Sequence, residues 1–356
     1  MIETPFASMT TMMTNSVLGQ FPAVLGQAIA IGYEEQGSQY DPTTTLLVVL
    51  GAIVFLVLLF GVNWFTRFGR IARATAKESV RQPVFLAMLA TSLIILLVNV
   101  WVPYFSMGDD TKMFKECGIS TILICGGLLA VWIASTTITE ELEGKTAMTL
   151  LSKPITRRDF ILGKFMGILQ TVAMYMVVVG ITFIALTPYK TYYDTREAGK
   201  RVELLKWETM EMGSNVVIDI PYLGTEVLDS TLQLPPILLL TFMEIAILAS
   251  IAVAIATRLP MAVNFTICLT IFVVAHLVPV LVRMSVEQNR LEIVSFFARL
   301  LGTIFPALDT FSMSAAITQG SAIPGIYVGT IAIYTLCFCS AMVLVSFILF
   351  EDRDLA

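Results

Sequence analysis

Seven long apolar segments alternate with shorter polar segments along this sequence. A helix that rises 1.5 Å per residue needs about 20 apolar residues to cross a hydrocarbon core of about 30 Å. Each apolar segment is long enough to do so, and the pattern therefore predicts an all-α polytopic membrane protein. The segments are Thr44–Phe65, Val84–Phe105, Ile119–Ile138, Ile161–Thr187, Leu234–Thr257, Ala262–Val282 and Pro324–Phe350.

Composition agrees with this class of protein. Hydrophobic residues make up 56 % of the chain and charged residues 14 %, whereas a soluble domain carries about 25 % charged residues. The formal net charge of −5 leaves no broad basic surface, so we expect no nucleic-acid partner. The start of the chain lacks the features of a removable signal peptide, so we expect the first span to remain in the mature protein. The cysteines show no metal-ligand spacing, and we predict no metal site; they are Cys117, Cys125, Cys268, Cys337 and Cys339.

The positions of lysine and arginine predict how the chain is oriented. Residues 1–43 contain no basic residue, whereas five follow the first span within residues 66–83. Cytoplasmic flanks of membrane helices are enriched in basic residues, so we expect an external N-terminal segment, 1–43, and a cytoplasmic tail, 351–356. The loops 188–233 and 283–323 are then external, and the loop 139–160 is cytoplasmic. This places the protein in the cytoplasmic (inner) membrane as a multi-pass protein.

Residues 66–83 read as a surface helix rather than a span. Their basic positions step by three, three, four and four, which places them within an arc of about 120° on a helix. These positions are Arg67, Arg70, Arg73, Lys77 and Arg81, and the opposite arc carries Phe68, Ala72, Thr75, Ala76 and Ser79. We expect a helix in the cytoplasmic interface with its basic side chains among anionic membrane lipids. The alternative is a topology signal with no further role.

The polar loop 139–160 contains a three-residue "GKT" at Gly144–Thr146. A phosphate-binding P-loop requires a glycine five positions before Gly144, and that position is Thr139, so we do not predict a nucleotide site here. Thr139 with the acidic residues after it instead predicts the start of a short helix. Its apolar stripe contains Leu150 and Leu151, and Pro154 ends it. A short amphipathic helix in an exposed loop favours a groove on a partner protein.

This loop resembles the permease subunits of ABC transporters of the ABC-2 type. Members of that family carry an acidic pair, a glycine, a threonine and a leucine-rich turn, then a Pro-x-x-Arg element and a lysine. The matching residues here are Glu141, Glu143, Thr146, Leu150, Leu151, Pro154, Arg157 and Lys164. Lys145 stands where family members have a glycine directly before the threonine, with Gly144 one place earlier. Residues 66–83 are similar to the family's interfacial elbow helix.

The resemblance implies a fold and a function. The six-helix transmembrane core would occupy 84–350, with 44–65 as an additional N-terminal span, and Leu291–Phe305 would form a re-entrant or interfacial helix. A permease of this kind has no ATPase domain and no cofactor of its own. Cytosolic ABC ATPase subunits bind ATP and Mg, and a second permease copy or paralogue completes the pathway. The loop residues named above would form the contact with the ATPase, and the transport direction would be export.

One ionisable residue lies near the middle of a span. Glu244 there costs about 2.5–3.5 kcal/mol on insertion scales, so we expect it to face the bundle interior or a wet cavity as a pathway residue. The alternative is a packing residue that hydrogen-bonds to partners such as His276 or Asn99. A secondary transporter also needs such a residue and stays open as an alternative function. An intramembrane enzyme using Glu244, His276 and Asp309 is a further alternative, although no nucleophile motif or metal-binding spacing accompanies them.

The external loop 188–233 contains a pattern of its own. The stretch "NVVIDIPYL" alternates as a strand does, and "RVELLKWETMEM" either pairs with it or forms a helix. The loop is therefore a small external cap or a solvated connector.

Overall fold

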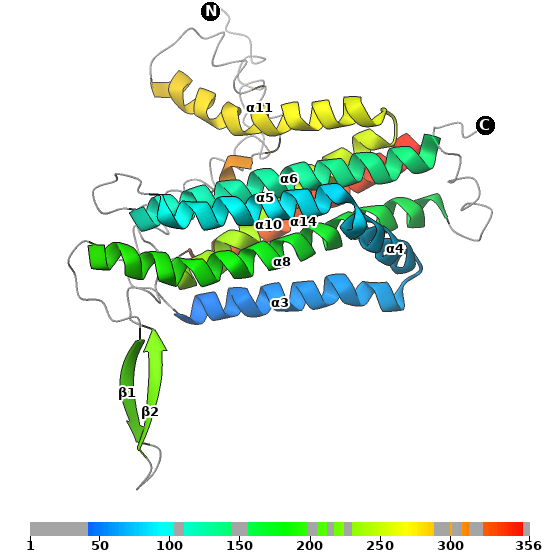
Figure 1. The fold of residues 1–356 in the computed structure, drawn as a ribbon. Coiled ribbons are helices and arrows are strands. Elements are labelled where there is room, and N and C mark those ends of the chain that lie inside the picture. The colour runs from blue at the N-terminus through cyan, green and yellow to red at the C-terminus, as the bar shows by residue number, and fades with distance from the viewer. Residues whose placement is uncertain are drawn as a thin grey trace, which may run out of the picture. The chain divides into compact units, whose positions relative to one another are not determined.

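A computed structural model describes most of the chain. The described residues are 42–102, 110–143, 156–197, 205–211, 217–223, 230–287, 300, 306, 308–312 and 323–351. Their elements are α3 (Pro42–Phe65), α4 (Arg67–Arg81), α5 (Pro83–Trp101), α6 (Asp110–Glu143), α8 (Arg157–Glu197), β1 (Leu205–Glu211), β2 (Val217–Leu223), α10 (Leu234–Ala256), α11 (Met261–Glu287), η1 (Leu308–Phe311) and α14 (Gly325–Glu351) (Figure 1).

Seven helices among the described residues are long and apolar enough to cross a membrane. They correspond one to one with the seven predicted segments, so the predicted polytopic helical fold is confirmed. Two of them are longer than the sequence predicted: α6 has 34 residues and α8 has 41. About 20 residues suffice to cross the hydrocarbon core, so both helices extend well beyond one span. Each helix exceeds its predicted span at both ends, and the ends at Glu143 and Arg157 flank residues 144–155.

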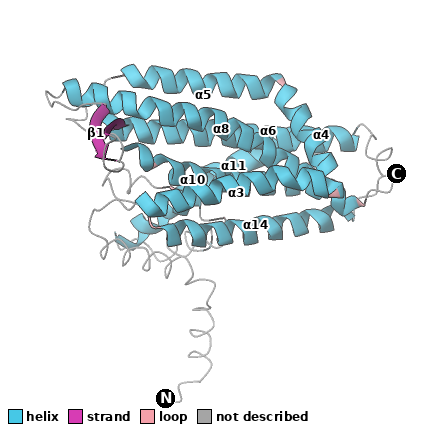
Figure 2. Cartoon of the chain, turned by 90° about the horizontal axis from the view of Figure 1, so that it is seen from below, coloured by secondary structure: helices cyan, strands magenta, loops and turns pink. Residues whose placement is uncertain are grey.

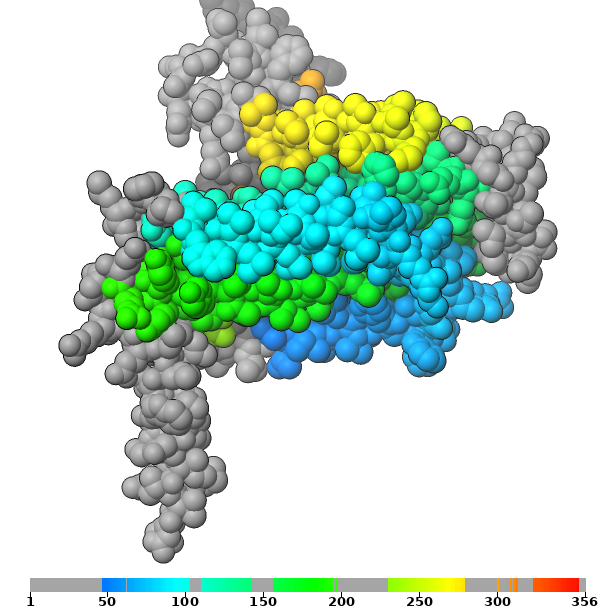
Figure 3. Space-filling model, in the orientation of Figure 1, coloured from blue at the N-terminus to red at the C-terminus, as the bar shows by residue number. Residues whose placement is uncertain are grey.

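The chain divides into two compact units. One contains Met1–Gln39 with Thr270–Thr310, and the other contains Tyr40–Leu269 with Phe311–Ala356. Helix α10 is the core of the larger unit and packs against α3, α6, α8 and α14. In its apolar window 83 % of the residues are buried, compared with 22 % for α5 and 28 % for α14. The outer helices therefore keep apolar faces for lipid, and the space-filling view shows α5 and α8 side by side on one such face (Figure 3).

Helix α4 confirms the surface helix predicted from the basic spacing. It begins after Thr66, whose Oγ1 accepts a hydrogen bond from the Gly69 N–H at 3.1 Å, and it ends before Pro83 opens α5. Figures 1 and 2 show it inclined to the ends of α3 and α5 that it joins. Its buried face differs from the predicted arc at one residue, because Gly69 is buried and Phe68 only half-buried. The other members of that face are Ala72, Thr75, Ala76 and Ser79.

Two glycines of α8 lie against α4, Gly167 at the small-residue face and Gly163 at the neighbouring Ile71. A Cβ added at Gly167 would lie 2.7 Å from the Thr75 Cβ and 2.8 Å from the Ala72 carbonyl oxygen. A Cβ added at Gly163 would lie 2.6 Å from the Ile71 Cβ. Only glycine allows the two backbones to approach this closely, as in other small-xxx-small helix contacts.

The segment 188–233 contains an antiparallel hairpin. Strand β1 pairs with β2, with Leu205 opposite Leu223 and Glu211 opposite Val217. This confirms the predicted strand and decides between the two alternatives for "RVELLKWETMEM" in favour of pairing. The helix α8 continues past the expected end of the span at Thr187, through Pro188 to Glu197. The predicted helix Leu291–Phe305, apart from Leu300, lies outside the described residues, as do residues 1–41 and 352–356.

Candidate functional site

The end of α6 leads into the loop 144–155. The predicted helix start at Thr139 is wrong, because α6 continues through this residue to Glu143 and buries it. The helix that begins at Asp110 already supplies carbonyl acceptors for the N–H groups of residues 139–143, so no new N-terminus forms there. The acidic residues Glu140 and Glu141 therefore lie at a helix C-terminus, where the helix dipole disfavours negative charge.

A buried ion pair compensates for one of these acidic residues. The Lys164 ammonium of α8 lies 2.6 Å from a carboxylate oxygen of Glu141. The side chain of Lys164 is only 3 % exposed and that of Glu141 is 24 % exposed. The Lys164 Nζ also lies 5.8 Å from the centre of the Phe160 ring. Glu141, predicted as a surface contact, thus ties the end of α6 to the beginning of α8, and the pair closes the base of the loop.

The first turn of α8 is fixed by a local cap. The Asp159 N–H donates to Thr156 Oγ1 at 3.1 Å, and the same hydroxyl donates to the Asp159 carboxylate at 2.8 Å. Threonine is a favoured N-cap residue, and an acidic side chain in the first turn suits the positive end of the helix dipole. This cap explains why the helix starts at Arg157, three residues beyond Pro154.

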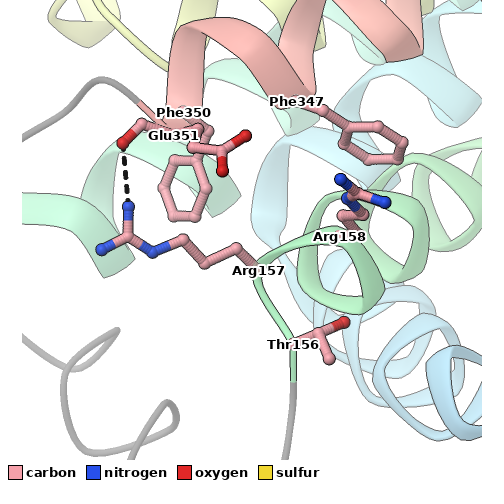
Figure 4. Close-up of a pocket in the computed structure, with 6 residues that line it drawn as sticks. All are labelled: Thr156, Arg157, Arg158, Phe347, Phe350 and Glu351. Carbon is pink, nitrogen blue, oxygen red and sulfur yellow. Dashed lines mark hydrogen bonds between the residues drawn. The ribbon is translucent and has the colours of Figure 1, made fainter.

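Arg157 connects this turn to the last turn of α14. Its guanidinium donates to the Glu351 carbonyl at 3.0 Å and lies 5.9 Å from the centre of the Phe350 ring (Figure 4). Carbonyl groups in the last turn of a helix have no partner within that helix, so this bond supplies one. The sequence predicted Arg157 as a surface contact, and the structure adds that it joins α8 to α14.

A pocket of about 350 Å³ opens beside this contact. Arg158 is exposed and lies next to Phe347, with no ion pair to any other described residue (Figure 4). The two guanidinium groups offer charge-assisted hydrogen bonds that suit a carboxylate. The lining residues are Thr156, Arg157, Arg158, Phe347, Phe350 and Glu351.

The structure does not describe the remaining residues that were predicted to contact the ATPase. Thr146, Leu150, Leu151 and Pro154 lie outside the described residues, and so does the side chain of Glu143. The amphipathic helix predicted for this loop therefore stays a prediction. The described part of the candidate site consists of the two helix ends that hold the loop.

A buried asparagine in the first turn of α11 connects three helices, a role that the sequence did not predict. Asn264 is fully buried, and its Nδ2 donates to Ser135 Oγ at 2.9 Å and to the Ala252 carbonyl at 3.2 Å. These bonds connect the first turn of α11 to α6 and α10. An amide within an apolar segment was the available signal, because a buried amide in a membrane helix needs partners on neighbouring helices.

A buried pair of amide side chains joins α3 to α8. Asn63 Nδ2 donates to Gln170 Oε1 at 3.1 Å, and Gln170 Nε2 donates to Asn63 Oδ1 at 2.9 Å. Gln170 Nε2 also lies 2.9 Å from the Leu59 carbonyl. The reciprocal pair fixes the first span against the centre of the bundle.

Glu244 lies in α10 and is 3 % exposed, which confirms that it faces the bundle interior. For the two residues suggested as its partners, the structure gives the following contacts. Asn99 lines an open groove between α5 and α6 together with Glu116, and His276 Nδ1 lies 2.9 Å from the Phe272 carbonyl of its own helix. The side chain of Asp309 lies outside the described residues. The catalytic grouping considered from the sequence therefore gains no support from these contacts.

The family model described as "ABC-2 family transporter protein" matches residues 41–355, which includes α3 and the six spans after it. No curated protein matches the sequence. Among the described residues, no group of three histidine, cysteine, aspartate or glutamate side chains is arranged to hold a metal ion.

Proposed function

Since the chain belongs to the ABC-2 family of transporter proteins, we propose that it couples ATP hydrolysis in a separate protein to movement of a substrate across the membrane. The chain itself is a multi-pass permease, a transport subunit rather than an enzyme. Its proposed partners are cytosolic ATPase subunits, which hold ATP and Mg, and a second permease copy or paralogue. The proposed direction is export, with the N-terminus outside the cell.

The observation that carries this proposal is the ion pair between two long helices at the ends that flank residues 144–155. At 1.5 Å per residue, the 34 residues of α6 and the 41 residues of α8 span about 51 Å and about 62 Å. Both lengths exceed the hydrocarbon core of about 30 Å. The Glu141–Lys164 pair joins the two helices where they meet the loop. A displacement of the loop by an ATPase would therefore move two continuous membrane helices together.

The pocket beside the loop offers a second contact for the same partner. Arg158 supplies an exposed positive charge there, while Arg157 connects the pocket wall to α14. An acidic side chain of the ATPase that binds here would push on the ends of α8 and α14 at once. Leu150 and Leu151 would meanwhile fill an apolar groove of the ATPase.

We test this proposal by replacing both Leu150 and Leu151 with aspartate in the full chain. The wild-type chain, purified from its own membrane with a mild detergent, should bring down an ABC ATPase identified by mass spectrometry. The double variant should lose that subunit, since two charges cannot enter an apolar groove. The matched control is Glu140→Gln, which changes an exposed residue of the α6 end and should keep the complex.

The result also separates the proposal from a secondary transporter. A secondary transporter would purify without an ATPase and would drive transport from an ion gradient. Retention of the ATPase and of ATP-dependent transport in the double aspartate variant would contradict the proposed contact.

We further propose that Glu244 lines or gates the substrate pathway, because it is the buried carboxylic acid of the central helix. Ionisable residues inside membrane bundles are usually functional. Glu244→Gln should slow transport while the complex still assembles. Unchanged transport in that variant would assign Glu244 to packing alone.

A further inference from the structure

Helix α4 presents all five of its basic side chains to the outside. Arg67, Arg70, Arg73, Lys77 and Arg81, together called the basic face, are exposed, and Glu78 is the only acidic residue of this helix. Directly before α4, Trp64 and Phe65 end α3 with 80 % and 91 % of their surfaces exposed. We propose that the basic face and these two aromatic residues form a binding site for anionic phospholipid headgroups.

The position of α4 along the chain favours a lipid as the occupant. A single residue, Thr66, separates it from α3, and another, Gln82, separates it from α5. Both neighbouring helices are candidate membrane spans. The short connections hold α4 at the level where the spans leave the hydrocarbon core. Tryptophan and phenylalanine at that level lie among lipid headgroups and upper acyl chains, as in other membrane-surface helices.

The packing of α4 fixes which of its faces meets the lipid. The small-residue face lies against α8 at Gly167, and Ile71 beside that face lies against Gly163; an added Cβ at either glycine would lie within 3 Å of α4. The helix therefore cannot turn its basic face toward the bundle without losing this close contact. The site has a defined orientation even before a lipid binds.

The side chain of Arg73 is held in place by two contacts of its own. Its guanidinium donates to the Asn63 carbonyl at 2.9 Å and lies 4.9 Å from the centre of the Trp64 ring. Asn63 is in turn held by the amide pair with Gln170. A planar guanidinium held over a ring is preorganised for a phosphate oxygen, so less side-chain entropy is lost on binding.

The other four basic side chains have no such structural bond. Arg67, Arg70, Lys77 and Arg81 make no hydrogen bond or ion pair with a described residue, so the fold does not depend on their charges. A basic residue close to an anionic membrane surface contributes roughly fivefold in affinity. Removal of two such charges should therefore weaken binding by about 25-fold.

We test the site with the full chain purified in an uncharged detergent. Native mass spectrometry would count the lipids bound as phosphatidylglycerol or phosphatidylcholine is added. We expect wild type to bind phosphatidylglycerol more tightly than phosphatidylcholine, and Arg70→Gln/Lys77→Gln to lose most of that preference. The charge-keeping variant Arg70→Lys/Lys77→Arg should retain it. Arg196→Gln, an exposed change in the last turn of α8, is the control away from the site and should bind as wild type does.

The proposal fails if the Gln double variant keeps the wild-type preference for phosphatidylglycerol. It also fails if inorganic phosphate displaces the lipid at equal concentration, because the site would then recognise a free anion rather than a headgroup. If the Gln double variant aggregates, Arg67→Gln/Arg81→Gln is used instead. It removes two charges at the ends of α4, and an unchanged preference for phosphatidylglycerol in that variant would likewise contradict the proposal. None of these readouts depends on an ATPase or on transport.

Discussion

Pairs of polar side chains connect the long helices of this bundle at several points along their length. Glu141 and Lys164 join α6 to α8 near the loop, and Asn63 and Gln170 join α3 to α8 farther along. In the middle of the bundle, Ser92 Oγ lies 2.6 Å from the Tyr175 hydroxyl and joins α5 to α8. Helices in lipid have no hydrophobic driving force for association, so such bonds act together with close packing to hold neighbouring helices.

The Glu141–Lys164 pair gives a prediction at this scale. Lys164→Met should leave the Glu141 carboxylate partly buried without its cation and destabilise the fold by about 3–5 kcal/mol. Replacing both partners, with Glu141→Gln and Lys164→Met, should recover most of that loss because no unpaired charge remains. Thermal unfolding of the purified variants in detergent measures both effects.

The neighbouring residue supplies the control for this cycle. Glu140 is exposed one position earlier, and Glu140→Gln should change the stability by less than about 0.5 kcal/mol. If Lys164→Met unfolds at the wild-type temperature, the ion pair contributes nothing to holding the base of the loop.

At the scale of elements, the contact between α4 and α8 depends on glycine. Gly167→Ala should push the two helices apart, because the new Cβ would lie 2.7 Å from the Thr75 Cβ and 2.8 Å from the Ala72 carbonyl oxygen. Overpacking of this kind costs about 1–3 kcal/mol. The melting temperature in detergent should fall, and α4 should become more accessible to protease.

A second helical glycine separates this steric effect from helix propensity. Gly329 of α14 has no atom within 4 Å of an added Cβ. Gly329→Ala should therefore be neutral or stabilise the helix by up to about 1 kcal/mol. Equal destabilisation by the two substitutions would contradict a tight α4–α8 contact.

The same element shows what the sequence could predict and what it could not. The basic spacing of α4 identified the helix and its exposed face, because charge periodicity is a local property of the chain. The receiving glycines Gly163 and Gly167 were missed, since a small residue reveals its role only when the opposite helix is known. The helix start predicted at Thr139 was wrong for a related reason. Capping patterns are local, and they have no effect inside a helix that began earlier in the chain, as α6 does.

For the candidate site too, local sequence patterns predicted single residues, whereas contacts between distant helices could not be predicted. Arg157 and Glu141 were found as residues of the loop ends, but their bonds to Glu351 and Lys164 join positions far apart in the sequence. Glu244 was correctly placed in the interior, because the free energy of burying a carboxyl group depends mainly on the apolar segment around it. Its neighbours depend on the packing of several helices, which periodicity does not give.

At the scale of the whole molecule, the orientation in the membrane decides whether an ATPase can reach the loop 144–155. Two spans, α5 and α6, separate α4 from this loop, so both lie on one side of the membrane. The hairpin β1–β2 follows one further span, α8, and lies on the opposite side. The basic residues of α4 favour the cytoplasm for its side, whereas residues 1–43 contain no basic residue.

Cysteine labelling in intact cells tests this orientation. In a chain whose native cysteines are replaced by serine, Asp219→Cys in β2 should react with a membrane-impermeant maleimide. Ala74→Cys, an exposed position of α4, should react only after the membrane is permeabilised. A chain that restores only the native Cys337 is the control, because this residue is exposed within the span α14 and its thiol, in contact with lipid, should react in neither condition. Labelling of Ala74→Cys but not Asp219→Cys in intact cells would place the loop outside, where no cytosolic ATPase could bind it.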